Sequence, residues 1–76
     1  MGRLRVLSGA EICQILEQHG FSPVRQRGSH IIMQKRTSAD DTCTVPVPAH
    51  KPVRVGTLAS IIRQSGLPRS LFEEPS

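Results

Sequence analysis

Segment 23–36 of the chain has the sequence PVRQRGSHIIMQKR. Its Gly28-Ser29 pair separates two runs, Pro23–Arg27 and His30–Arg36, and pairs of this kind join the strands of tight hairpins. Proline near the start of the first run is typical of an edge strand, because proline has no backbone N–H to donate to a neighbouring strand. We therefore predict two antiparallel strands, with His30 at the first position of the second.

A third strand is predicted at Thr42–Val47, because apolar and polar residues alternate there. Cys43, Val45 and Val47 would lie on one face and the residues between them on the other. This period of two is typical of a strand with one buried and one solvated face. The polar segment 37–41 would form the hairpin loop that precedes it.

An amphipathic helix is predicted before the strands. Ser8 can cap its backbone while Glu11, three residues later, bonds back in a capping box. Ile12, Ile15 and Leu16 have the spacing of one buried helical face. Gly20 can take the left-handed conformation that ends a helix.

A second amphipathic helix is predicted after the strands. Leu58, Ile61 and Ile62 form its apolar face and Gly66 ends it. Pro68 then suits the first turn of a short helix through about Glu73. The sequence thus predicts a single α+β domain over residues 1–76. Its order is helix, three antiparallel strands, helix, with both helices on one face of the sheet and a short C-terminal helical turn.

The positive charge of the chain is concentrated in its middle. The net charge is +4 over 76 residues and the sequence pI is about 10.1. All of this excess lies in the span 24–54, while the segments on either side are neutral. The cations of that span are Arg25, Arg27, Lys35, Arg36, Lys51 and Arg54. Such clustering favours a polyanionic partner, although a solvated surface could have the same composition.

The remaining composition narrows the class of protein. Cys13 and Cys43 have no metal-like spacing and are interpreted as small buried hydrophobes, which suits a reducing compartment. Asp40 and Asp41 are interpreted as turn residues rather than metal ligands, and no Cys or His pair has the short spacing of a metal site. The sequence therefore predicts neither a metal nor a cofactor. No apolar run is long enough to span a bilayer and no secretory signal is present. We expect a protein of the cytoplasm that does not contact a membrane.

His30 is the candidate for proton transfer to or from RNA. Histidine ordinarily titrates near about pH 6.5, so it can accept a proton at cytosolic pH. Removing the proton of a ribose 2′-hydroxyl lets that oxygen attack the adjacent phosphorus, with general-base help worth roughly 10²- to 10⁴-fold. The alternative is a polar residue that merely satisfies the turn. Arg25 and Arg27 would hold the phosphate if they shared a face with His30, which depends on a strand register that the sequence does not define.

Other RNA contacts are predicted around this histidine. His50, in the loop after the third strand, could be a second acid, a phosphate contact or a loop hydrogen bond. The sheet has no exposed aromatic ring for base stacking, which leaves shape and phosphate contacts of the kind used with double-stranded RNA. The predicted substrate-binding residues are Arg25, Arg27, Gly28, Ser29, Lys35, Arg36 and His50.

The chain resembles the HicA (YcfA-like) family of mRNA interferase toxins over nearly its whole length. The resemblance is carried by Gly20-Phe21, Gly28-Ser29-His30, the segment VPVPAH at 45–50 and the segment GTLASIIRQSGL at 56–67. It implies a double-stranded-RNA-binding-like fold and the toxin of a toxin–antitoxin pair, neutralised by a HicB-type antitoxin. It also implies that His30, which matches the histidine of the glycine-turn motif, is catalytic. Many relatives carry a further histidine where Lys35 stands, so the role of that histidine does not transfer.

Three function classes remain in competition. The first is a metal-independent endoribonuclease that cleaves mRNA with His30 as general base. The second is a non-catalytic RNA-binding module of the same fold. The third is a partner-binding domain whose basic face only docks an acidic antitoxin.

Overall fold

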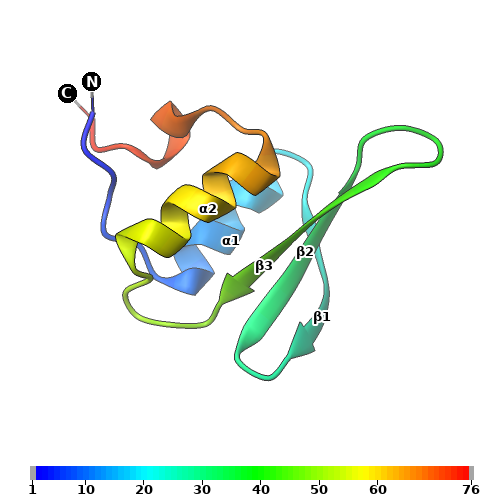
Figure 1. Ribbon diagram of the computed structural model, residues 1–76, viewed down its shortest axis with the longest axis horizontal. Coiled ribbons are helices and arrows are strands. Elements are labelled where there is room, and N and C mark those ends of the chain that lie inside the picture. The colour runs from blue at the N-terminus through cyan, green and yellow to red at the C-terminus, as the bar shows by residue number, and fades with distance from the viewer. Residues whose placement is uncertain (1, 76) are drawn as a thin grey trace.

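The computed structural model describes residues 2–75 and has the predicted order of elements (Figure 1). Helix α1 is followed by a three-stranded antiparallel sheet and then by helix α2 and a short 3-10 turn, η1. The bounds are α1 Gly9–Gln18, β1 Ser22–Arg27, β2 His30–Arg36, β3 Thr42–Pro48, α2 Val55–Ser65 and η1 Arg69–Phe72. The predicted α+β class and the final helical turn are confirmed.

Helix α1 begins and ends as its sequence predicts. The backbone N–H of Ser8 donates to Glu11 Oε1 at 2.9 Å, and the N–H of Glu11 donates to Ser8 Oγ at 3.1 Å, which completes the capping box. After the helix, Gly20 has φ +96°, and the N–H of Phe21 returns to the carbonyl of Leu16 at 3.0 Å. These local bonds direct the chain into β1.

The sheet has the strand order β1-β2-β3, with β2 paired on both sides. Along β3, Val45 and Val47 are buried while Thr44 and Pro46 are exposed, so the predicted alternation is confirmed. All six residues of β1 are exposed, as expected for an edge strand that only β2 pairs with. The sheet therefore has one apolar face, and α2 packs mainly on β3.

Both helices cover the same apolar face of this sheet (Figure 1), as predicted. Their buried residues, including Ile12 and Leu16 of α1 and Leu58 of α2, pack in one core with Met33 of β2. The further core residues are Leu4, Leu7, Phe21, Val45, Val47, Val53, Ile61, Ile62 and Phe72. Within residues 2–75, no helix has the length and apolar character needed to cross a membrane.

The ends of the described chain lie side by side and close the core (Figure 1). Leu4 pairs with Glu73 in an antiparallel bridge, and the N–H of Arg5 donates to the carbonyl of Phe72 at 2.8 Å. Phe72 is 0% exposed. Neither this bridge nor the burial of Leu4 and Leu7 was expected from the sequence, because a single bridge between distant segments has no periodic signature.

The loop between β3 and α2 is bonded to the segment around the start of α1. The N–H of Gly9 donates to the carbonyl of His50 at 2.9 Å, and the N–H of Val53 donates to the carbonyl of Leu7 at 2.8 Å. Gly9 lies so close to β3 that a β-carbon would collide with the backbone of Pro48 and Ala49. The position of the His50 loop thus depends on a glycine at residue 9.

Gly9→Ala is expected to destabilise the protein by about 1–3 kcal/mol, because the added methyl group meets backbone atoms that cannot move aside cheaply. The matched control is Gly56→Ala, also in the first turn of a helix, where an added β-carbon meets nothing within 4 Å. That change should stabilise by roughly 0.4–1 kcal/mol through the unfolded state. The two variants are compared by their midpoints of unfolding in urea. Equal midpoints would contradict the close contact of Gly9 with the backbone of Pro48 and Ala49.

Glu11→Ala is expected to lower stability at neutral pH but much less in acid. The hydrogen bonds from Ser8 hold the pKa of the Glu11 carboxyl below its ordinary value of 4.5. A lowered pKa means that the ionised form stabilises the fold above about pH 4.5, and that this contribution is lost as the pH falls below it. Urea unfolding at about pH 7 and about pH 3 measures the difference. Glu17→Ala is the control, because it removes a carboxylate from the other end of α1 without touching the capping box.

Candidate functional site: a groove between strand β3 and helix α2

A β-bulge in β1 determines which side chains lie beside His30. The register pairs Pro23 with Met33 but Arg25 with Ile32, so Val24 is the extra residue. Beyond the bulge, Arg27 pairs with His30. Directly paired residues point to the same face of a sheet, so Arg25, Arg27 and His30 share the face that does not carry the core. The sequence alone did not decide whether the two arginines share a face with His30, and the register shows that they do.

The turn before His30 is hydrogen-bonded to the residue that follows β3. Gly28 has φ +58°, and the side-chain amide of Gln26 donates to its carbonyl at 3.2 Å. The carbonyl of Ser29 accepts a hydrogen bond from the N–H of Ala49 at 2.6 Å, and His30 pairs with Pro48 in the ladder. The backbone of Gly28 and Ser29 therefore holds His30 beside the last residues of β3.

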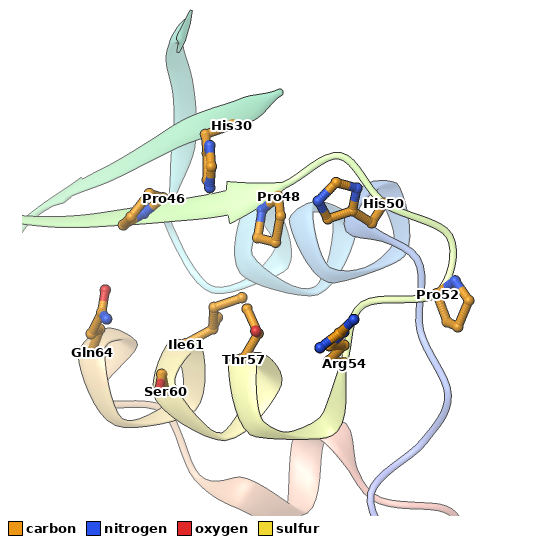
Figure 2. A pocket seen from close by; sticks show the side chains of 10 residues that line it. All are labelled: His30, Pro46, Pro48, His50, Pro52, Arg54, Thr57, Ser60, Ile61 and Gln64. Atoms are coloured by element: carbon orange, nitrogen blue, oxygen red, sulfur yellow. The ribbon is translucent and has the colours of Figure 1, made fainter. Parts of the chain in front are cut away.

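A groove of about 610 Å³ lies between β3 and α2 (Figure 2). His30 extends into it from β2, and Pro46, Pro48 and His50 line the strand side. The helix side is lined by Arg54, Thr57, Ser60, Ile61 and Gln64, which lie on one face of α2. His30 thus lies beside two elements that follow it in the sequence, β3 and α2.

The two ends of the groove differ in charge. Because β3 and α2 run in opposite directions along it, Gln64 lies near Pro46, and Arg54 lies near His50 (Figure 2). The Arg54 end also contains the N-terminus of α2, where Arg54 is the N-cap and its side chain makes no capping hydrogen bond. Unpaired N–H groups at a helix N-terminus and a guanidinium both favour an anion. No charged side chain lines the Gln64 end.

Most predicted cations lie on the His30 face of the sheet and are exposed. Arg36 pairs with Thr42 and follows His30 at an even spacing, so it shares the face with Arg25 and Arg27. Within residues 2–75, the single ion pair joins Arg69 to Glu73. None of these three arginines is therefore neutralised by a carboxylate in the described chain, and their charge is available to a polyanion.

Lys35 does not join this face. It pairs with Cys43 on the opposite side of the sheet, and its ammonium lies 5.8 Å from the centre of the Phe21 ring. The structure therefore places Lys35 apart from the other predicted substrate-binding residues, because alternation along β2 separates it from His30. Its side chain covers a core aromatic ring instead.

The helix side of the groove was not expected from the sequence. Arg54, Thr57, Ser60 and Gln64 belong to no predicted site, although Arg54 was counted within the basic span. Their spacing of three, three and four residues places them on one helical face, directly beside the apolar face of Leu58, Ile61 and Ile62. This row of polar side chains next to the buried face of the helix is the sequence pattern that could have identified the helix side of the groove.

The two cysteines lie outside the groove lining. Both are half-buried, whereas full burial was predicted, and partial burial raises the pKa of the Cys13 thiol. Cys43 Sγ lies 3.0 Å from the carbonyl oxygen of Gln64, which it contacts from the core side of the sheet. Within the described residues, no three His, Cys, Asp or Glu side chains lie together in a way that could hold a metal ion.

Comparison with known proteins gives one match. No curated protein and no solved structure matches the chain. The family model described as the HicA toxin of bacterial toxin–antitoxin systems matches residues 9–67. That span contains both helices, all three strands and every residue that lines the groove. The chain therefore belongs to the HicA toxin family, and its family role is that of a toxin whose partner is an antitoxin.

Proposed function

We propose that this toxin is an endoribonuclease that cleaves mRNA in the cytoplasm, with His30 as general base. The observation that carries the proposal is the position of His30, which extends into a groove that also holds His50 and Arg54. Two imidazoles and a guanidinium around one cavity supply a proton acceptor, a proton donor and a phosphate ligand. The exposed cations on the same sheet face would hold the RNA on either side.

The proposed reaction uses the ribose of the substrate as the nucleophile. An imidazole nitrogen of His30 takes the proton of a 2′-hydroxyl, and the 2′-oxygen forms a bond to the adjacent phosphorus. The bond between phosphorus and the 5′-oxygen of the next nucleotide breaks. That 5′-oxygen takes a proton from the imidazolium form of His50, which leaves a 2′,3′-cyclic phosphate and a 5′-hydroxyl. Neither a metal nor a cofactor is needed to generate the nucleophile.

Arg54 would stabilise the charge that develops on phosphorus oxygens during this step. Its guanidinium offers paired donors of the geometry that phosphate oxygens accept, and it lies at the end of the groove where α2 begins. Arg25, Arg27 and Arg36 lie on the same sheet face as His30 but do not line the groove. We assign them to binding of the flanking phosphates, which contributes affinity without sequence information.

The antitoxin partner would act by covering this same face. We propose a HicB-type protein that places acidic or apolar groups over His30 and the arginines, since those cations lack carboxylate partners within residues 2–75. Such a contact would exclude RNA by direct competition. A complex that left His30 open to solvent would contradict this arrangement.

His30→Ala is expected to reduce the rate of RNA cleavage by roughly 10²- to 10⁴-fold, because it removes the proton acceptor. RNA affinity should change little, since the phosphate ligands remain. Single-turnover cleavage of a labelled RNA, measured in the presence of EDTA, gives the rate. His19→Ala is the matched control, because His19 caps the end of α1 and does not line the groove.

Two outcomes would contradict the nuclease proposal. Equal cleavage by the His30→Ala and His19→Ala variants would remove His30 from the chemistry. Intact RNA with every variant, together with retained binding, would favour the non-catalytic RNA-binding module instead. A 2′-deoxy substitution at the cleaved nucleotide should abolish cleavage in the wild type, because it deletes the nucleophile.

Arg54→Ala is expected to weaken RNA binding and its dependence on salt. If Arg54 contacts one phosphate, the slope of log K against log salt should become shallower by about 0.7 for single-stranded RNA. Titrations at several salt concentrations measure both quantities. Arg69→Ala is the control, because Arg69 is paired with Glu73 outside the groove. An identical slope in the Arg54→Ala variant and the wild type would place the phosphate elsewhere.

A further inference from the structure

We propose that the groove accepts one unpaired RNA nucleotide, with its base at the Gln64 end and its phosphate at the Arg54 end. The proposal rests on the proposed function and names the form of RNA that the site takes. It departs from the expectation drawn from the sequence, in which shape and phosphate contacts favoured a duplex. An unpaired nucleotide is favoured here because apolar and neutral polar side chains line most of the groove.

The apolar lining of the groove suits the face of a nucleobase. Pro46 is exposed and presents its saturated ring on the strand side, whereas Pro48 and Ile61 are buried and line the groove with little exposed surface (Figure 2). A base removed from its helix is commonly held between apolar or aromatic side chains in this manner. A base inside a duplex has both faces covered by its neighbours, so these apolar walls would contact nothing. The groove is therefore better suited to a base that has left the stack.

The Gln64 end carries groups that can recognise the edge of a base. The Gln64 amide provides both a donor and an acceptor, and no hydrogen bond engages that amide in the described chain. Arg63 donates to the Ser60 hydroxyl oxygen at 3.2 Å, which leaves the Ser60 proton free to donate into the groove. Neutral groups with fixed directions distinguish bases, whereas cations mainly bind phosphate.

The dimensions and polarity of the groove agree with a single nucleotide. Its volume of about 610 Å³ lies within the usual range for small-molecule sites, roughly 300–1,000 Å³. His30 extends into the middle of it, between the uncharged end and the Arg54 end (Figure 2). A base near Gln64 and a phosphate near Arg54 would place the ribose beside the imidazole, where the proposed proton transfer requires it.

The first test compares the binding of paired and unpaired RNA. Wild-type protein is titrated with 2′-fluoro oligonucleotides, which lack the attacking hydroxyl and therefore cannot be cleaved by the proposed reaction. We expect the single strand to bind at least about tenfold more tightly than the same sequence annealed to its complement. Equal or tighter binding of the duplex would overturn the proposal.

The second test asks whether α2 recognises the base. In a set of single strands that differ at one position, the wild type should prefer one base by about 2- to 10-fold. Gln64→Ala should remove that preference, while Arg54→Ala should weaken the binding of all four strands equally. Gln14→Ala is the control, because Gln14 is an exposed glutamine of α1 that does not line the groove. An unchanged preference in the Gln64→Ala variant would overturn base recognition by α2.

These results are distinguishable from failure of the proposed function. Tight single-strand binding that depends on Gln64, without any cleavage of ordinary RNA, would support this inference and reject the nuclease. Cleavage that depends on His30 but prefers duplex RNA would reject this inference and leave the nuclease standing. Ser60→Ala gives a second variant for base recognition, because it removes one hydroxyl that bonds only to Arg63 within residues 2–75.

Discussion

The site depends on one constraint, which is the register that β2 makes with its two neighbours. His30 is paired with Arg27 on one side and with Pro48 on the other, and the bond from Ala49 N–H to the Ser29 carbonyl extends that pairing beyond the strand ends. A shift of one residue would move His30 and Arg36 to the core face and bring Lys35 to the opposite face. The bulge in β1 and the short Gly28-Ser29 turn therefore determine which side chains share a face with His30.

The parts of the fold that could be predicted are those that depend on local chemistry. Ser8 and Glu11 determine the start of α1 whatever the rest of the chain does, and Gly66, with φ +71°, ends α2 for the same reason. The bulge at Val24 could not be predicted, because it depends on how two strands twist against each other. The bridge between Leu4 and Glu73 joins the two ends of the chain, and no local pattern encodes such a contact.

Only the strand side of the candidate site could be predicted, because only that side depends on local sequence. His30 and His50 follow a turn and a strand end, so motif and position were sufficient to select them. The helix side of the groove required knowledge of where α2 lies against β3, which only packing of the apolar face of α2 determines. Lys35 shows the converse. Its charge suggested the basic surface, but alternation along β2 places it over Phe21 on the other face.

The central claim is that RNA is cleaved by its own 2′-hydroxyl after an imidazole in the groove takes the proton. Mass spectrometry of the fragments tests this most directly, because each mechanism leaves different ends. Attack by the 2′-oxygen leaves a 2′,3′-cyclic phosphate on the upstream fragment and a 5′-hydroxyl on the downstream fragment, which is the result predicted here. Fragments with 3′-hydroxyl and 5′-phosphate ends would mean that water attacked the phosphorus, and would contradict the role assigned to His30.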